Sequence, residues 1–247
     1  MAARQDRLYR CRMAGQGMWP GDRRVRIAVQ RVRLDGREYR VVRPARPLKN
    51  ASLRYIDDWF DFTVDRVEGR QMGAFWLLAA RSRHSIVYLP TRTAPCPPGL
   101  EDDGVPVDLV LSHHSLQLRP ARWKAIRQRI DHGNASRELR TARLPADDVL
   151  TEEDIDFDVL YHAENRDRLG KRVHGETLFM TGSSTVFREQ ARHFFEVAKT
   201  GPAVAARSYA TYPVACRYHY CVGFDYSVRE PDGQQIVHVE YLPSWTR

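Results

Sequence analysis

Hydrophobic and polar residues alternate over two stretches near the start of the chain, with the two-residue period of half-buried strands. The first stretch covers residues 25–29 and the second covers residues 38–43. The Asp35-Gly36 pair between them is typical of a tight turn that joins antiparallel strands. The pattern therefore predicts a hairpin at the beginning of the folded part of the chain.

The middle of the chain contains an ambiguous segment and four clearer patterns. Residues 54–66 fit a helix and a strand equally well, whereas residues 74–80 and 85–89 indicate buried elements separated by a polar turn. Residues 107–111 predict a strand. Apolar residues at helical spacing after a proline predict a short, basic, amphipathic helix over residues 120–130.

The last third of the chain has the clearest pattern. Residues 177–180 predict a strand, and serines then cap a helix that we expect to end at Gly201-Pro202. Alternating residues at 217–228 and 237–241 predict a hairpin closed by a proline turn at 230–233. These elements make a β-α-β-β unit, half of a ferredoxin-like fold, which resembles RNA-recognition modules and CRISPR RNA-processing proteins.

Together the elements predict an α+β protein with mixed sheets. Residues 93–106 contain four prolines and an acidic run ending in glycine, so we expect an exposed loop and a candidate domain boundary there. The predicted organisation is a flexible basic arm over residues 1–22, a β-rich part over 23–106 and an α+β part over 107–247. A single domain is the alternative.

Positive charge is concentrated at the start of the chain. The protein has 35 arginines and four lysines, and residues 1–46 hold 13 of the arginines against four acidic residues, a net charge of +9. The rest of the chain is close to neutral. Because each phosphate that a basic group neutralises releases counterions, this arm and hairpin predict binding to RNA or DNA backbone. A solvated face that aids solubility is the alternative.

The expected phosphate contacts are arginines on the predicted hairpin and on the basic helix. They are Arg23, Arg24, Arg26, Arg31, Arg33, Arg122, Arg127 and Arg129. The leading hypothesis is a nucleic-acid backbone-binding protein, RNA more than DNA, within a bacterial nucleoprotein or CRISPR-like assembly that supplies protein partners. The basic run at residues 119–143 precedes seven acidic residues within 147–158, and these two runs could pair with each other.

Compartment and cofactors follow from the composition. Four cysteines are too few for a disulfide framework in 247 residues, which favours the reducing cytoplasm. The longest apolar run, residues 74–80, is too short to span a bilayer, and charges interrupt the start of the chain where a signal peptide would be apolar. We expect no membrane association, no metal and no cofactor.

An enzyme is the second hypothesis. The predicted hairpin in the last third gathers His219, Asp225, His238 and Glu240 on its polar face, and its register sets Asp225 across from His238. These groups could exchange protons in a nuclease or a transferase. A third hypothesis is an immunity or adaptor-type interaction module whose basic arm binds an acidic protein.

One spacing resembles the zinc deaminases, in which a histidine and two cysteines hold zinc and a glutamate moves protons. The residues that carry this resemblance are His174, Gly175, Glu176, Pro213, Cys216 and Cys221. It implies a deaminase-like enzyme. In the chain, however, a predicted strand follows Glu176, and Cys216 and Cys221 would point to opposite faces of a straight strand.

Two further patterns resemble other enzyme families. The order of His162, the strand at 177–180, the helix after it and Glu240 is similar to ADP-ribosyltransferase folds. Arg188 and His193 reproduce the R-x4-H spacing of one class of helical ribonucleases.

Adjacent histidines lie at the end of the strand predicted over residues 107–111. His113 or His114 could supply a general base or a metal ligand. The alternation of side chains along a strand predicts that the two rings point in opposite directions.

Overall fold

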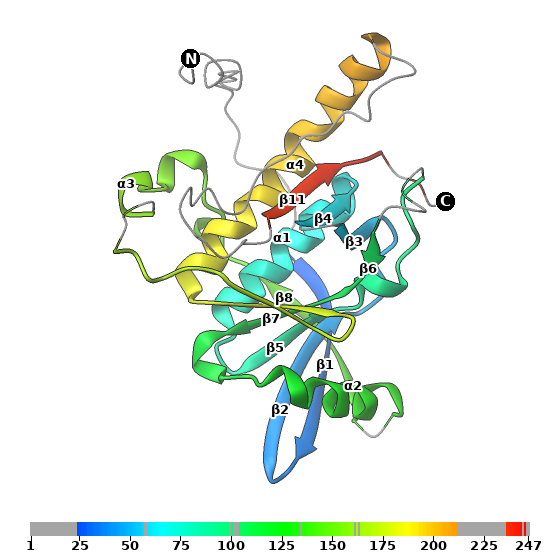
Figure 1. Cartoon of the computed structure of the whole chain (residues 1–247), viewed down its shortest axis with the longest axis vertical. Helices are drawn as coiled ribbons and strands as arrows, with labels where there is room; N and C mark the ends of the chain where they lie inside the picture. Colours follow the sequence, from blue (N-terminus) through cyan, green and yellow to red (C-terminus); the bar gives the residue numbers. More distant parts are fainter. Residues whose placement is uncertain are drawn as a thin grey trace.

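Two sheets with two long helices form the body of the protein (Figure 1). The computed structural model describes residues 24–56, 59–98, 100, 104–133, 135–160, 162, 164–211, 236–243 and 245. In the larger sheet the strand order is β8 (Arg137–Arg143), β1 (Arg24–Leu34), β2 (Arg37–Pro44), β5 (Ser85–Leu89), β7 (Asp108–His113), β10 (Thr177–Gly182) and β9 (Gly170–His174). In the smaller sheet it is β11 (Ile236–Tyr241), β4 (Trp59–Val64), β3 (Ala51–Ile56) and β6 (Val105–Pro106).

The helices connect these strands. They are α1 (Arg66–Arg81), α2 (Trp123–Asp131), α3 (Phe157–Leu160) and α4 (Ser184–Thr211). Short 3₁₀ turns lie at Thr91–Thr93, His114–Leu116, Pro120–Arg122, Ala146–Asp148 and Glu152–Asp154. Both sheets contain parallel and antiparallel pairs, so the predicted α+β class with mixed sheets is confirmed.

The predicted first hairpin is present as β1 and β2. The two strands pair from Ile27 with Pro44 to Leu34 with Arg37, around the expected turn. Asp35 and Gly36 both have positive φ, 51° and 74°, which is the geometry that matches the twist of a two-residue hairpin.

The buried side of β1 changes along its length. Val25, Ile27 and Val29 belong to the main hydrophobic core, whereas Val32 and Leu34 belong to a second core on the opposite side of the sheet. The exposed side chains therefore change sides as well. This switch decides which arginines of β1 lie together.

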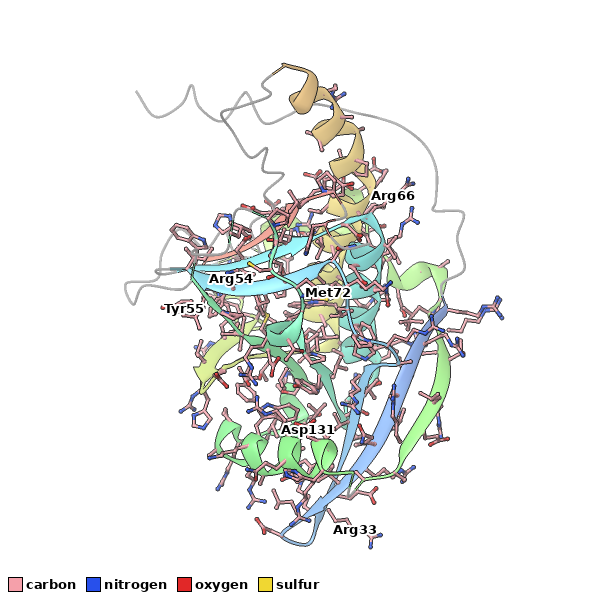
Figure 2. All side chains as sticks on the ribbon, turned by 90° about the vertical axis from the view of Figure 1, so that its right-hand side faces the viewer. Arg33, Arg54, Tyr55, Arg66, Met72 and Asp131 are labelled. Atoms are coloured by element: carbon pink, nitrogen blue, oxygen red, sulfur yellow. The ribbon has the colours of Figure 1, made fainter. Side chains whose placement is uncertain are left out.

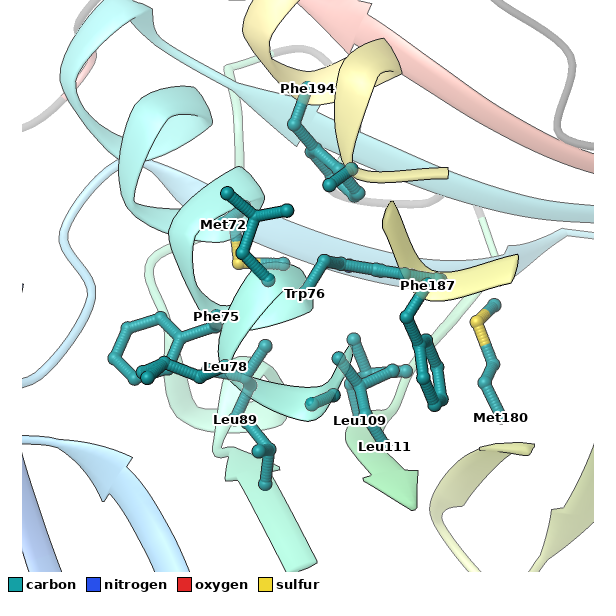
Figure 3. Packing of buried hydrophobic residues seen from close by; sticks show 14 of the residues in the cluster. Met72, Phe75, Trp76, Leu78, Leu89, Leu109, Leu111, Met180, Phe187 and Phe194 are labelled. Atoms are coloured by element: carbon teal, nitrogen blue, oxygen red, sulfur yellow. The ribbon is translucent and has the colours of Figure 1, made fainter. Parts of the chain in front are cut away.

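The main core joins α1 and α4 to both sheets. The Trp76 ring on α1 lies 5.7 Å from the Phe187 ring and 5.7 Å from the Phe194 ring on α4, and Figure 3 shows these rings among the aliphatic residues of the strands. Residues 74–80, predicted only as a buried element, are thus part of a helix. The ambiguous residues 54–66 include the end of β3 and all of β4.

The second core lies under α2, on the other side of the larger sheet. Trp123, Ile126 and Ile130 are all at most 3% exposed and pack on side chains of β1, β2, β5, β7 and β10. These three residues are the face that helical spacing predicted, so the prediction for residues 120–130 is confirmed.

The prediction that Gly201-Pro202 ends a helix is wrong, because α4 continues to Thr211. The glycine has a packing role here: a Cβ atom at Gly201 would lie 2.3 Å from Cγ of Tyr241 on β11. A glycine therefore lets α4 approach the smaller sheet rather than marking the helix end. In the described part of the chain no helix is long and apolar enough to cross a membrane.

The connections differ from the sequence prediction in one respect. β10 and β11 lie in different sheets, so these two strands do not form the expected ferredoxin-like arrangement. The predicted strand at 217–228 and the turn at 230–233 lie outside the described residues. Strands from both sides of residue 106 lie in the larger sheet, and the division of the chain there stays a prediction.

Candidate nucleic-acid interface and a buried polar face

Arginines are concentrated at one end of the larger sheet. β1 carries four arginines, and β2 and β8 carry three each, whereas β2 and β8 contain one glutamate each. β8 is an edge strand that pairs with β1, and six of its seven residues are exposed. This end of the sheet therefore combines accessibility with an excess of positive charge.

The strand register places six arginines on one face of these three strands; Arg37 lies next to the hairpin turn, and the other five lie away from the turn. Arg24 pairs with Arg143, Gln30 pairs with Arg137, and Ala28 pairs with Arg43. Directly paired residues project to the same side of a sheet, and so do alternate residues along a strand. We call this surface the arginine face; its members are Arg24, Arg26, Arg43, Arg137 and Arg143.

Arg43 lies at the crowded inner side of the arginine face. Its Nε is buried and has no hydrogen-bond partner. Burial lowers the pKa of its guanidinium, and the positive charge of Arg137 lowers it further, while Asp131 at the end of α2 partly offsets this. The positive charges of Arg43 and Arg137 therefore repel each other. A bound anion would reduce this repulsion.

The opposite face of the same strands carries four arginines together with both glutamates. The Arg31 guanidinium lies 3.3 Å and that of Arg33 3.7 Å from the carboxylate of Glu38. Arg140 lies 2.7 Å from Glu138 on β8. Both glutamates of the three strands are therefore on the face away from the arginine face.

The structure separates the arginines that the sequence grouped as phosphate contacts. Arg24 and Arg26 are on the arginine face, Arg31 and Arg33 are on the opposite face, and Arg23 lies outside the described residues. Arg43, Arg137 and Arg143 were missed, because their places beside Arg24 and Arg26 depend on pairing between distant segments.

The three expected contacts on the basic helix segment have structural partners. Arg127 Nη1 donates to Asp108, which is 1% exposed, over 3.2 Å. Arg122 lies 3.5 Å from Asp35 in the hairpin turn, and Arg129 donates to the carbonyl oxygen of Arg33. These side chains hold α2 against the sheet.

Asp148 of the acidic run contacts arginines outside the basic run. The Asp148 carboxylate lies 2.5 Å from the guanidinium of Arg81 on α1 and 3.8 Å from that of Arg188 on α4. The acidic segment is thus attached to the helices of the main core.

Two of the four predicted catalytic residues can be placed. His238 and Glu240 lie on β11, where they pair in parallel with Asp61 and Thr63 of β4. His219 and Asp225 lie outside the described residues. Val237 and Val239, which alternate with His238 and Glu240 along β11, are fully buried.

The smaller sheet has one polar face, opposite the side that packs on the core. We call it the polar face; its members are Ser52 and Arg54 on β3, Asp61 and Thr63 on β4, and His238 and Glu240 on β11. Arg54, Asp61 and His238 lie side by side across the three strands. All four members on β3 and β4 are at most 6% exposed.

Asp61 is the most perturbed group of the polar face. It is 3% exposed; Thr63 donates to Oδ2 over 3.2 Å, and Oδ1 has no hydrogen-bond partner. Burial raises the pKa of Asp61 to about 8; the negative charge of Glu240 adds to this, and the Thr63 hydrogen bond and Arg54 oppose it. The carboxyl group therefore holds its proton at neutral pH.

Arg54 connects the polar face to the proline-rich segment. It donates to the carbonyl oxygen of Gly104 over 2.8 Å and to Sγ of Cys96 over 3.4 Å. Sequence reasoning missed Arg54 and Asp61, which fall in the ambiguous segment. The signal was present, because Asp61 and Thr63 alternate with Phe60 and Phe62 in the pattern of a strand.

The residues that resemble enzyme families are not brought into one site. His174–Glu176 form the turn from β9 to β10, where Glu176 contacts Arg92 over 2.8 Å, and the proline and cysteines of that resemblance lie outside the described residues. His162 is exposed. His193 is buried on α4, whereas Arg188, five residues earlier, contacts Asp148.

The prediction that the adjacent histidines point in opposite directions is wrong. The rings of His113 and His114 lie 4.3 Å apart, because the strand ends at His113 and a 3₁₀ turn follows. His113 Nδ1 contacts Oγ of Ser115 over 2.8 Å. Within the described ranges, no group of three or more His, Cys, Asp or Glu residues is arranged to hold a metal ion.

Comparison with known proteins gives no family for this chain. No family model, no curated protein and no solved structure matches it. The two surfaces described above are therefore the basis for assigning a function.

Proposed function

We propose that this protein binds the sugar-phosphate backbone of nucleic acid, RNA or DNA, through the arginine face. The observation that carries the proposal is the charge difference between the two sides of one three-stranded segment. Six arginines lie on one side, five of them in the arginine face, whereas both glutamates and four arginines lie on the other. A surface on which several guanidinium groups gather suits phosphates, which arginine binds through paired N–H donors.

The chemistry of the surface favours backbone recognition over base recognition. Arginines on neighbouring strands present several donors across a broad face, and such contacts position a polyanion without reading its sequence. Affinity from these contacts falls steeply as salt rises, because counterions are no longer released favourably. A subunit role in a larger nucleoprotein assembly is consistent with this mode of binding.

Matched triple variants test the proposal. One variant carries Arg24→Gln, Arg26→Gln and Arg143→Gln, all on the arginine face; the other carries Arg31→Gln, Arg33→Gln and Arg140→Gln on the opposite face of β1 and β8. Both remove the same charge from the same two strands.

Binding is measured by fluorescence anisotropy with single-stranded RNA and duplex DNA over a series of salt concentrations. The first variant is expected to bind more weakly and to reduce the salt slope by about 0.7 per arginine for single strands and about 0.9 for duplex. The second variant should retain most of the affinity. Equal losses would overturn the assignment to the arginine face, and no binding by the wild type would point to an acidic protein partner instead.

A further inference from the structure

Gln30 on β1 lies next to two members of the arginine face. It pairs directly with Arg137 on β8. Two positions earlier on β1, Ala28 pairs with Arg43, which makes Arg43 a diagonal neighbour of Gln30. The side chains of Gln30, Arg43 and Arg137 therefore project from the same side of the sheet. Gln30 is 2% exposed, so an uncharged amide is buried beside these guanidinium groups.

The segment after α2 fixes the orientation of the Gln30 amide. Figure 2 labels Asp131 at the end of α2, shortly before this segment. Nε2 of Gln30 donates to the carbonyl oxygen of Ala135 over 3.1 Å. A carbonyl only accepts hydrogen bonds, so the NH₂ group faces Ala135 and Oε1 points away from it. This oxygen is buried and has no hydrogen-bond partner among the described residues.

Arg43 carries a second unpaired atom beside Gln30. Its Nε–H is a donor that is buried, and within the described part of the chain it has no acceptor. Oε1 of Gln30 is an acceptor that lacks a donor. Buried polar atoms without partners are costly, and native proteins contain few of them. Two such atoms of complementary kind on neighbouring side chains indicate a ligand that supplies both a donor and an acceptor.

We propose that Gln30 and Arg43 together bind one ribose-phosphate unit, so that the arginine face prefers RNA to DNA. In RNA the 2′-hydroxyl is on the carbon next to the one that carries the 3′-phosphate, which makes a donor and an anionic acceptor neighbours. The hydroxyl donates to Oε1 of Gln30, and phosphate oxygens accept from Arg43 and Arg137. This inference rests on the proposed nucleic-acid function and adds the class of nucleic acid.

DNA lacks the hydroxyl group that Gln30 would bind. A deoxyribose places no donor at Oε1, so this buried oxygen stays unpaired in a complex with DNA. For this reason, sites built to hydrogen-bond a hydroxyl discriminate against analogues that lack it. The 2′-hydroxyl is also the group by which proteins in general distinguish RNA from DNA. The other arginines contribute to the affinity for both nucleic acids, because both have phosphates.

Arg137 lies across the approach to this site. Its side chain extends from β8 over β1 and donates to the carbonyl oxygen of Ala45, which follows β2. Arg137 is exposed, so exchange of this carbonyl for a phosphate oxygen costs little. The phosphate also reduces the repulsion between Arg137 and Arg43. Movement of Arg137 to the phosphate gives the ribose access to Gln30.

Three single strands that differ only at the 2′ position test this inference on the wild-type protein. They are RNA, DNA and 2′-fluoro RNA of one sequence without uracil or thymine, so that the bases are identical. Fluorine keeps the RNA-like sugar conformation but donates no hydrogen bond, which separates recognition of the hydroxyl from recognition of shape. In fluorescence anisotropy we expect RNA to bind about tenfold more tightly than DNA, and 2′-fluoro RNA to bind like DNA.

Two variants assign the preference to Gln30. Gln30→Met keeps the length of the side chain and removes Oε1, so the affinity for RNA should fall to that for DNA while the affinity for DNA is unchanged. Gln128→Met, at an exposed glutamine of α2, should change neither affinity. Thermal melts check that both variants are folded. Equal losses of RNA and DNA affinity in Gln30→Met would overturn the role of Gln30.

The outcomes separate this inference from the function on which it rests. If the wild type binds all three strands equally, or binds 2′-fluoro RNA as tightly as RNA, the ribose site is overturned and backbone binding by the arginine face is retained. If the wild type binds none of the strands, both the ribose site and the proposed function are overturned.

Discussion

The arginine face and the polar face treat charge in opposite ways. The arginine face gathers like charges, and four of its five guanidinium groups are exposed to water and salt that screen them, so these four cost little. The polar face removes Asp61 and Arg54 from water, and each must be stabilised by specific neighbours. Exposed charged residues can therefore be substituted with little effect on stability and are available for binding. Buried charged residues are held in place by the fold, and they shift the pKa values of their neighbours.

The largest contrast should come from removing one arginine from each region. Arg54→Met deletes the hydrogen bonds to Gly104 and Cys96 from a buried guanidinium. We expect the free energy of unfolding to fall by about 1.5–3 kcal/mol, the range for a hydrogen bond from a charged group. Arg26→Met, at an exposed side chain of the arginine face, should change it by less than about 0.5 kcal/mol. Urea denaturation measures the free energy of unfolding of both variants. Similar losses in the two variants would contradict the difference between the two faces.

The pH dependence of stability should come largely from the polar face. Because the pKa of Asp61 is about 8 in the folded protein and about 3.9 in an unfolded chain, the folded state binds the extra proton. This contribution to stability is complete below about pH 4 and is lost as the pH rises towards 8, by at most about 1.4 kcal/mol per pH unit. Asp61→Asn should flatten the profile; an unchanged profile in thermal melts would contradict the assignment.

A smaller effect of opposite sign is expected at the arginine face. Arg43→Gln removes a guanidinium whose Nε is buried without a partner and whose charge is repelled by Arg137. The free energy of unfolding should rise by about 0.5–1 kcal/mol while nucleic-acid affinity falls. Urea denaturation and anisotropy on the same samples test this. A loss of both properties would mean that Arg43 stabilises the fold.

The smallest effect should come from the face opposite the arginine face. Glu38→Gln releases Arg31 and Arg33 from their exposed carboxylate partner. Such surface pairs contribute little, so stability should change by less than about 0.5 kcal/mol. Nucleic-acid affinity at low salt should rise slightly, because two arginines lose their competing anion. A large loss of stability would show that the pair holds the hairpin together.

Local sequence patterns were sufficient for several elements. The Asp35-Gly36 turn specified the first hairpin because both of its residues tolerate positive φ. The stripe of Trp123, Ile126 and Ile130 specified α2, because helical spacing places all three on one side. The concentration of arginine near the start of the chain was also visible, although not which arginines act together.

Long-range pairing decided what local patterns left open. Gly201 lies inside α4 and contacts Tyr241, a residue of β11 that is 40 positions later in the chain. The environment of Asp61 depended on β11, which pairs with β4 although nearly 180 residues separate them in the chain. Neither contact has a signal within the neighbouring residues, so the predicted end of the helix was wrong and Asp61 was missed.

By itself, the sequence determined the α+β class, the first hairpin, the buried stripe of α2, and the excess of positive charge. The tertiary structure alone decided which arginines share a face, because β1 changes its buried side between two cores and is joined by the distant β8. It alone also placed two carboxyl groups together on the polar face. Periodicity fixes the conformation of a segment and its buried side, but the partner of that side is selected by packing of the whole chain.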